Sequence, residues 1–254
     1  MRAHDIITAM YDGQTLIFGH RGAKAYAPMN TLPAFELAAA QGAHGIELDV
    51  HRSKDGYPVI VHDFVVDATS DGVGAVVDMT LAELKALDAG AWFDPRFAGT
   101  RIPTLDEVFE TVGARLFVNV EIKSESVDTD GVEQVVADCI ARHNMDARVI
   151  VSSFNPLTLR RFRALLPDVP IGFLYYSDSP AEVWDVIADV PYEAYHPYFA
   201  EITPDMVAEH VRLGRVINTW TVNDPAQAVA LHDMGVRGII TDAPDVILNA
   251  LANR

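Results

Sequence analysis

Two acidic residues alternate with aliphatic residues at positions 45–50, which read Gly-Ile-Glu-Leu-Asp-Val. This period-two pattern is typical of a β-strand, in which residues two apart share a face. Glu47 and Asp49 therefore point the same way, about 6 to 7 Å from each other along the strand. Neighbouring carboxylates repel each other and resist burial, so a cation must compensate them. Pairs of this kind bind hard divalent cations.

A histidine follows the next apolar run, residues 58–61. The two runs are separated by Ser-Lys-Asp-Gly at positions 53–56, which is a turn signal. An antiparallel hairpin about this turn would return His62 alongside Leu48 and Asp49. An imidazole close to a carboxylate pair can transfer protons. The alternative is a hairpin with a solvated polar face and an incidental histidine.

His20 and Arg21 stand between two glycines, directly after the short apolar run at positions 16–18. The glycines suggest a sharp exit from a strand that displays both side chains. A histidine and an arginine in that position suit proton transfer and phosphate binding. An ordinary loop is the competing interpretation of this motif when it is considered alone.

A third strand pattern, residues 116–123, carries Asn119, Glu121 and Lys123 on its polar face. Glu121 repeats the chemistry of Glu47 and Asp49, and Lys123 supplies a cation. The strands of a parallel sheet are normally buried on both faces. Two polar-faced strands in such a sheet therefore indicate a functional site.

The remaining chain alternates strand and helix patterns, which favours a parallel sheet with crossover helices. Eight βα units predict an α/β fold, a (β/α)8 TIM barrel, with catalytic residues at the C-terminal ends of the strands. The eight strands begin near residues 16, 45, 116, 149, 171, 194, 216 and 238. The polar residues expected at those ends are His20, Arg21, Glu47, Asp49, Glu121, Lys123, Ser153 and Trp220.

Residues 64–103 interrupt this alternation and are interpreted as a small insertion after the second barrel strand, packed over one end of the barrel. The chain of 254 residues is expected to form a single domain, 1–254. A formal charge of −17 argues against binding to nucleic acid or stable anchoring on anionic membranes. Cys139 is the only cysteine, and the sequence contains no apolar run of signal-peptide or transmembrane length. We therefore expect a cytoplasmic protein, with its oligomeric state left open.

These motifs resemble the glycerophosphodiester phosphodiesterase family, and they follow one another in the family's order along nearly the whole chain. Short insertion motifs such as Trp92-Phe93 and Ile102-Pro103-Thr104-Leu105 belong to the resemblance as well. Its main motifs are Gly19-His20-Arg21-Gly22, Asn30-Thr31-Leu32-Pro33, Glu47-Leu48-Asp49, His62-Asp63, Val120-Glu121-Ile122-Lys123, Ser152-Ser153-Phe154, Trp220-Thr221-Val222-Asn223 and Thr241-Asp242.

The resemblance implies a metal-dependent TIM-barrel hydrolase that cleaves glycerophosphodiesters to an alcohol and sn-glycerol 3-phosphate. It implies one divalent cation, Mg²⁺ or Ca²⁺ with Mn²⁺ possible, held by Glu47, Asp49 and Glu121. His20 and His62 would be the general acid and base, in an order that the sequence leaves open. The residues implied to bind phosphate or substrate are Arg21, Lys123, Trp220 and Ser153.

One departure from the family pattern is Met29, which precedes Asn30 where family members usually have Glu. Loss of that Glu could weaken activity or alter substrate preference. His51, beside Arg52, is expected to be solvated, and Asp242 is expected to orient neighbouring groups rather than bind metal.

Four alternatives stay open from the sequence. The first is a lysophospholipid substrate, as for a lysophospholipase D, and the second is a phosphoinositide substrate, as for a phosphoinositide-type phosphodiesterase. An apolar groove on the insertion, through Trp92, Phe93 and Phe97, would favour lipid. A barrel that performs metal-assisted enolisation would leave the two histidines and Arg21 without a role. The fourth alternative is a barrel that binds metal without catalysing a reaction.

Overall fold

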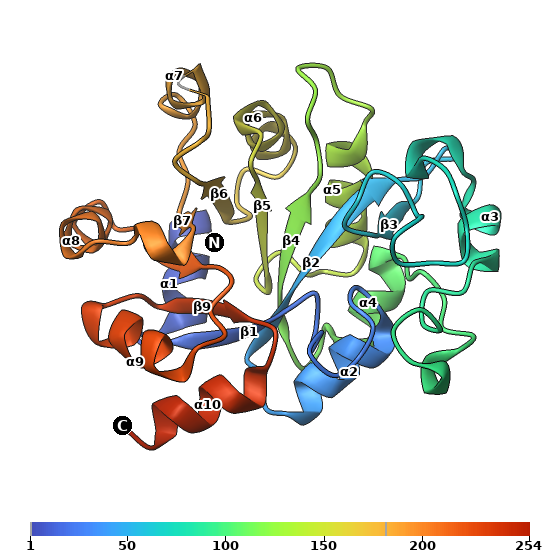
Figure 1. Cartoon of the computed structure of the whole chain (residues 1–254). Coiled ribbons are helices and arrows are strands. Elements are labelled where there is room, and N and C mark those ends of the chain that lie inside the picture. Colours follow the sequence, from blue (N-terminus) through green and yellow to red (C-terminus); the bar gives the residue numbers. More distant parts are fainter. Residues whose placement is uncertain (1, 181) are drawn as a thin grey trace.

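Eight parallel strands form the centre of the molecule and close into a barrel (Figure 1). The computed structural model describes residues 2–180 and 182–254. β1 (Leu16–His20) pairs with both β2 (Gly45–Arg52) and β9 (Gly238–Thr241), which seals the sheet. The (β/α)8 TIM barrel predicted from the strand patterns is confirmed. The other barrel strands are β4 (Phe117–Ile122), β5 (Val149–Ser153), β6 (Ile171–Tyr175), β7 (Ala194–Pro197) and β8 (Val216–Thr219).

The short strand β3 (Pro58–Ile60) forms the predicted antiparallel hairpin with β2. Gly56 occupies the turn with φ of 91°, a left-handed conformation that glycine adopts without steric cost. Beyond β3 the backbone N–H of Val61 donates to the carbonyl of Asp49 at 3.1 Å. This register brings His62 back beside the acidic strand.

A helix follows each barrel strand and packs outside the barrel (Figure 1). Several of these helices begin with proline, whose missing N–H costs nothing in the first turn. Side chains of Thr104, Asn155, Thr203 and Asp224 accept backbone N–H groups at four helix N-termini. The helices are α2 (Leu32–Ala40), α4 (Leu105–Val112), α5 (Val132–Arg142), α6 (Pro156–Leu165), α7 (Glu182–Ile187), α8 (Pro204–Arg212), α9 (Pro225–Met234) and α10 (Pro244–Ala252). Within the described ranges no helix has the length and apolarity to cross a bilayer.

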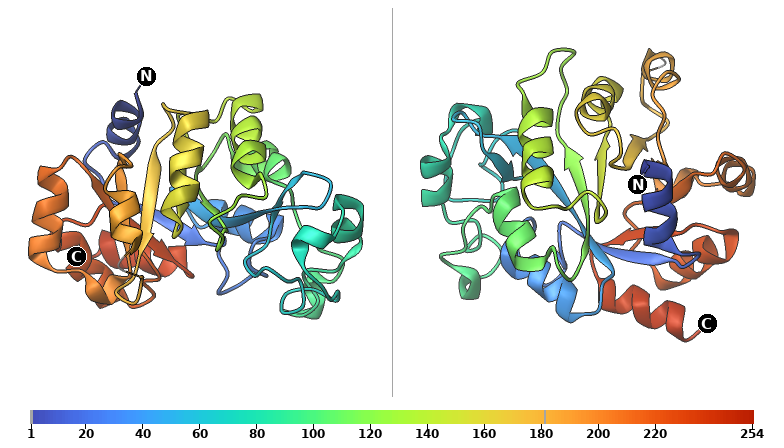
Figure 2. Two further views of the ribbon diagram at one scale, coloured as in Figure 1. Left: turned by 90° about the horizontal axis from the view of Figure 1, so that it is seen from above. Right: turned by 180° about the vertical axis from the view of Figure 1, so that it is seen from behind.

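The first helix, α1 (Ala3–Tyr11), was not predicted from the sequence. Its Ile7, Met10 and Tyr11 pack with the inward-facing residues at the beginning of the barrel strands. The Tyr11 hydroxyl donates to Oδ1 of Asn218 at 2.6 Å, inside the barrel. α1 therefore closes the N-terminal end of the barrel, where it is visible in the rear view of Figure 2.

Alternation along the strands separates an apolar outer face from a partly polar interior. Ile46, Leu48 and Val50 of β2 belong to the main hydrophobic core, together with residues of α2, α4 and α5. The residues between them, Glu47 and Asp49, face the interior. The period-two pattern therefore decides which side chains are available for chemistry.

Two interior polar residues occupy space that glycines leave free. His196 and Asn218 are buried, and Nδ2 of Asn218 lies 3.0 Å from Nε2 of His196. A Cβ at Gly172 would lie 2.6 Å from Nε2 of His196, and one at Gly238 would lie 1.8 Å from Oδ1 of Asn218. Larger residues at either glycine would displace this polar pair.

The insertion between β3 and α4 packs beside the barrel next to β2 and β3 (Figure 1). It contains the 3₁₀ turns η1 (Val76–Asp78) and η2 (Pro95–Phe97) and the helix α3 (Leu81–Ala86). Phe93 contacts Trp92 and Phe97 edge to face within the insertion. A small hydrophobic core of its own supports the segment and consists of Val59, Val61, Val66, Val76, Leu84, Ala89 and Ile102.

Candidate active site

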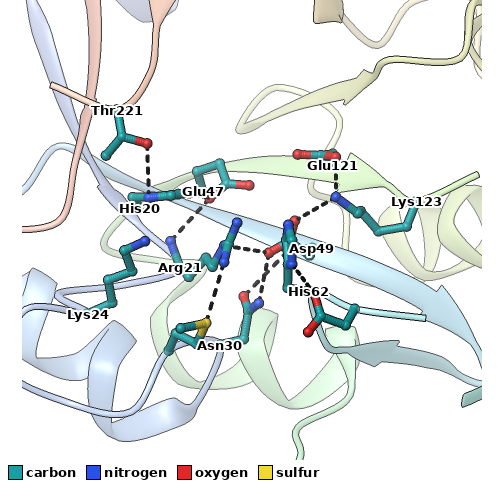
Figure 3. A network of polar contacts seen from close by, with 12 residues as sticks. His20, Arg21, Lys24, Asn30, Glu47, Asp49, His62, Glu121, Lys123 and Thr221 are labelled. Carbon is teal, nitrogen blue, oxygen red and sulfur yellow. Dashed lines mark hydrogen bonds and ion pairs between the residues drawn. The ribbon is translucent and has the colours of Figure 1, made fainter. Parts of the chain in front are cut away.

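Three buried carboxylates meet at the C-terminal ends of β2 and β4 (Figure 3). Asp49 lies opposite Glu121 in the parallel register, and Glu47 precedes Asp49 by two residues. One oxygen of each carboxylate lies within 4.8 Å of an oxygen of the other two. Glu47 and Asp49 come together because of strand periodicity, whereas Glu121 joins them through sheet register.

Arg21 and Lys123 supply the positive charge next to this cluster. Nε of Arg21 lies 3.0 Å from Oδ2 of Asp49, and Nζ of Lys123 lies 2.8 Å from Oε1 of Glu121 and 3.5 Å from Oδ1 of Asp49. Burial opposes ionisation of Asp49, but Arg21 and Lys123 outweigh it and lower the pKa of Asp49 to about 2. Burial also disfavours the charged form of Lys123, yet Glu121 and Asp49 raise its pKa above the usual value.

Glu47 and Glu121 resist ionisation in the cluster. Burial first, and then repulsion from Asp49 and Glu121, raise the pKa of Glu47 well above its usual value. Its Oε2 accepts the backbone N–H of Arg21 at 3.1 Å. Burial likewise raises the pKa of Glu121 against the opposing effect of Lys123. Three carboxyl groups that ionise together only when more positive charge is added fit a hard divalent cation.

Asn30 is a site residue whose role sequence reasoning missed. Its Nδ2 donates to Oδ2 of Asp49 at 2.8 Å, while its Oδ1 accepts the backbone N–H of Asp49 at 3.4 Å. Both Asn30 and Arg21 have positive φ, at 58° and 55°, so the loop after β1 presents them through left-handed backbone. The family resemblance included Asn30 in the motif before α2, but no pattern along the chain marked it as a partner of Asp49.

His20 is held by Asp242, which directly follows β9. Nδ1 of His20 lies 2.7 Å from Oδ1 of Asp242, and Asn223 donates to the other carboxylate oxygen at 2.9 Å. Nε2 of His20 then faces the carboxylate cluster, 3.9 Å from Oε2 of Glu47. Burial lowers the pKa of His20 to about 4 against the opposing effect of Asp242. The expectation that Asp242 orients a neighbouring group agrees with this geometry.

His62 lies across the pocket from His20 and pairs with Asp63, whose Oδ1 is 2.6 Å from Nδ1 of His62. Its side chain is one-third exposed, which is more than that of His20. Burial lowers the pKa of His62, partly offset by the carboxylate of Asp49.

A pocket of about 270 Å³ joins these groups. Trp220, Leu174 and Ile240 form its apolar side, and the indole N–H of Trp220 donates to the carbonyl of His196 at 2.9 Å. The site residues predicted from the sequence that line this pocket are His20, Arg21, Glu47, His62, Glu121, Lys123 and Trp220.

Ser153 and His51 differ from the residues around the pocket. The Ser153 hydroxyl is buried, donates to the carbonyl of Ile122 at 2.8 Å and accepts the N–H of Asn155 at 3.1 Å. The prediction that His51 is solvated was wrong. Its side chain is 2% exposed and contacts the ring of Phe64 edge to face, because the insertion folds over it.

A larger groove of about 780 Å³ opens from the pocket. The two cavities share His62, Glu121, Lys123 and Phe154. The loops after β4, β5 and β6 form most of the groove, and Phe64 of the insertion adds to it. The groove does not include Trp92, Phe93 and Phe97, through which the lipid alternative expected it to run.

Known proteins resemble the chain throughout its length. A sequence model of the glycerophosphoryl diester phosphodiesterase family matches residues 20–246. The glycerophosphodiester phosphodiesterase of Caldanaerobacter subterraneus is 42% identical over 237 residues, covering 93% of this chain and 97% of that protein. A Bacillus subtilis glycerophosphodiester phosphodiesterase is 33% identical, covering 91% of this chain and 84% of that protein.

A solved structure extends the similarity to the fold. It is that of an Oleispira antarctica phosphodiesterase in complex with the product sn-glycerol-3-phosphate, and it matches with a TM-score of 0.85 at 30% identity. The match covers 96% of this chain and 99% of the other. The chain therefore belongs to the glycerophosphoryl diester phosphodiesterase family.

Proposed function

We propose that this protein hydrolyses glycerophosphodiesters to an alcohol and sn-glycerol 3-phosphate with the help of one divalent cation. The observation that carries the proposal is the convergence of His20, His62, Glu47 and Glu121 on one pocket, with the buried Asp49 as the third carboxylate of the cluster. The relative from Oleispira antarctica was solved with sn-glycerol-3-phosphate, which is the product expected here.

The carboxylates of Glu47, Asp49 and Glu121 would hold the cation, for which Mg²⁺, Ca²⁺ and Mn²⁺ are all suitable with oxygen ligands. A bound cation would neutralise the phosphate oxygens and the charge that develops on them. Arg21 and Lys123 would bind the same phosphate from the protein side, since both stand next to the cluster.

The two histidines would divide the proton transfers. Asp242 accepts the Nδ1–H of His20, which leaves Nε2 unprotonated and directed into the pocket, where it can accept the proton of the nucleophile. The nucleophile is either water or a glycerol hydroxyl. His62 lines both the pocket and the groove. As an imidazolium it would carry a proton on Nε2 as well as on the Nδ1 that faces Asp63, and it would give the Nε2 proton to the departing alcohol oxygen. Trp220 would pack against glycerol, and Ser153 would support the wall of the groove.

The groove would receive the alcohol part of the substrate. Phe64, Phe154 and Tyr176 present aromatic rings along it, and Glu125 and Glu182 add negative charge. Aromatic faces and carboxylates bind ammonium groups, which favours choline or ethanolamine as the alcohol. A lysophospholipid is the second candidate, because a groove of about 780 Å³ with an apolar wall could also hold an acyl chain.

The test is an assay of phosphate-ester products from glycerophosphocholine, glycerophosphoethanolamine and lysophosphatidylcholine, with added Mg²⁺ or Ca²⁺ and with EDTA. Release of sn-glycerol 3-phosphate that EDTA and His20→Ala abolish is the expected result. Release of lysophosphatidic acid alone would favour the lipid candidate. A folded protein that binds the metal and turns over none of the substrates would identify a non-catalytic barrel.

A further inference from the structure

Asn119 has a buried amide that the proposed chemistry does not use. The residue lies on β4, between Glu47 of β2 and Ile150 of β5 in the sheet register. It is 1% exposed and lines the catalytic pocket. Within the described part of the chain, neither its Nδ2 nor its Oδ1 has a hydrogen-bond partner. Native proteins pair nearly all buried amides, so this side chain lacks an expected partner.

A structural role does not account for the amide of Asn119. The other buried asparagine in the barrel interior, Asn218, shows what such a role looks like. It accepts the hydroxyl of Tyr11 at 2.6 Å and contacts His196 at 3.0 Å. Asn119 makes no comparable contact with a described residue, and its side chain faces the pocket instead.

The chemistry of the amide limits what it can bind. A phosphate accepts hydrogen bonds only, so it would leave Oδ1 of Asn119 without a partner. Arg21 and Lys123 are in addition the donors expected to bind the phosphate. A cation takes oxygen ligands only, which would leave the Nδ2 donors unused. A hydroxyl group both donates and accepts, and an amide offers one acceptor and two donors. The partner that uses the whole amide of Asn119 is therefore a hydroxyl, which is supplied by water when no substrate is bound and by the alcohol groups of a bound substrate.

Apart from the residues assigned above to the cation, the phosphate and the proton transfers, the polar groups that line the pocket are Asn119 and Thr221. The hydroxyl of Thr221 already lies 3.2 Å from Nδ1 of His20. Leu174, Trp220 and Ile240 present apolar surfaces, and the indole N–H of Trp220 is used by the carbonyl of His196. Asn119 also lies directly below Glu121 on β4 and beside Glu47, so a glycerol attached to phosphate on that cluster would reach it.

We propose that Asn119 binds the hydroxyl groups of the glycerol moiety and so selects glycerol phosphates over alkyl phosphates without hydroxyls. This assignment rests on the function proposed above and makes Asn119 a specificity-determining residue of the same pocket.

Binding of two ligands to two proteins tests the assignment. The dissociation constants of sn-glycerol 3-phosphate and n-propyl phosphate would be measured by calorimetry with saturating Mg²⁺, for the wild type and Asn119→Leu. The wild type is expected to prefer sn-glycerol 3-phosphate by about 10-fold or more, which is typical of a site built to bind hydroxyls. Asn119→Leu is expected to bind the two ligands alike, with the affinity for n-propyl phosphate and for Mg²⁺ unchanged.

Asn218→Leu is the matched control, because it removes a buried asparagine with partners from the same barrel interior. It is expected to lower Tm and keep the ligand preference, whereas Asn119→Leu is expected to keep Tm and lose the preference. If the leucine variant does not fold, Asn119→Ala replaces it, with circular dichroism as the check of folding.

The assignment is overturned if the wild type binds sn-glycerol 3-phosphate and n-propyl phosphate equally well, or if Asn119→Leu still prefers sn-glycerol 3-phosphate. It is also overturned if the variant loses affinity for both ligands to the same extent, or loses affinity for Mg²⁺. Hydrolysis of glycerophosphocholine by the wild type decides the proposed function separately. If the wild type hydrolyses glycerophosphocholine but Asn119→Leu keeps the preference for sn-glycerol 3-phosphate, the role of Asn119 is disproved and the proposed function stands.

Discussion

Nδ1 of His20 lies 2.7 Å from Oδ1 of Asp242, although the two residues are 222 positions apart in the chain. The contact forms because β1 and β9 are neighbours where the barrel closes. Asp242 also accepts from Asn223 at 2.9 Å and lies 3.3 Å from Nζ of Lys24. Burial opposes ionisation of Asp242, but the contact with His20, together with Lys24 and Asn223, outweighs it and lowers the pKa of Asp242 to about 2. The carboxylate is therefore charged at neutral pH and fixes the proton of His20 on Nδ1.

Asp242→Asn should lower kcat by about 10²-fold or more, because the amide can donate to Nδ1 of His20 and so favour the tautomer with its proton on Nε2. Steady-state hydrolysis of glycerophosphocholine measures the effect. The control is Asp233→Asn, whose side chain is 61% exposed on α9 and pairs with Arg254. Equal activity of the two variants would show that His20 does not depend on Asp242.

The affinity for Mg²⁺ should rise with pH. Burial and neighbouring carboxylates raise the pKa of Glu47 above its usual value, so this group holds a proton in the metal-free protein at a pH where an exposed Glu is ionised. Binding of a cation requires the ionised form of Glu47 and releases that proton, which costs free energy. Raising the pH through the elevated pKa removes this cost, because Glu47 is then already ionised. Calorimetry in buffers of different ionisation enthalpy measures both affinity and proton release. An affinity that is independent of pH, with no proton released, would contradict the raised pKa.

Met29→Glu should raise kcat/KM. Nη1 of Arg21 lies 3.4 Å from the sulfur of Met29, which orients a guanidinium weakly. A carboxylate at this position would form a charge-assisted hydrogen bond and hold Arg21 toward the phosphate, with an expected gain of about 3- to 10-fold. Met29→Gln has a similar length without the charge and should gain less. A decrease with Glu and none with Gln would mean that the added charge draws Arg21 away from Asp49.

The combined Glu125→Gln and Glu182→Gln variant should lose part of the preference for cationic alcohols. Both residues line the groove and are exposed, so their effect is electrostatic and decreases with added salt. We expect kcat/KM for glycerophosphocholine to fall about 3- to 10-fold relative to glycerophosphoglycerol at low ionic strength. Glu110→Gln, on the exposed face of α4, is the control. If the ratio for the double variant equals that of the wild type, the alcohol does not lie in this groove.

Local pattern was sufficient to predict much of the barrel and part of the site. The alternation of Ile46, Leu48 and Val50 with polar residues places Glu47 and Asp49 on one face, because side chains along a strand point to alternate sides. The turn at Gly56 was recognisable, and a two-strand hairpin then determines that His62 returns beside Asp49. These features depend on residues that are close in sequence.

Other features depended on contacts that local pattern does not contain. The helix α1 is short, and its N-cap residue, Arg2, makes no side-chain cap, so its stability comes from Ile7, Met10 and Tyr11 packing into the barrel end. The burial of His51 likewise depends on the insertion, which brings Phe64 against its ring.

The sequence by itself determined the residue types of the site, the strand periodicity that exposes them to the barrel interior and the order of the eight strands. Only the tertiary structure decided which of those residues have partners. Asn30 binds Asp49 and Asp242 binds His20 because loops and strands far apart in the chain meet at one end of the barrel. Asn119 has the same polar character as Asn218, yet it lacks a described partner because its position on β4 faces the pocket. Hydrogen bonding of a buried group depends on what surrounds it in space, and that information is not contained in its neighbours along the chain.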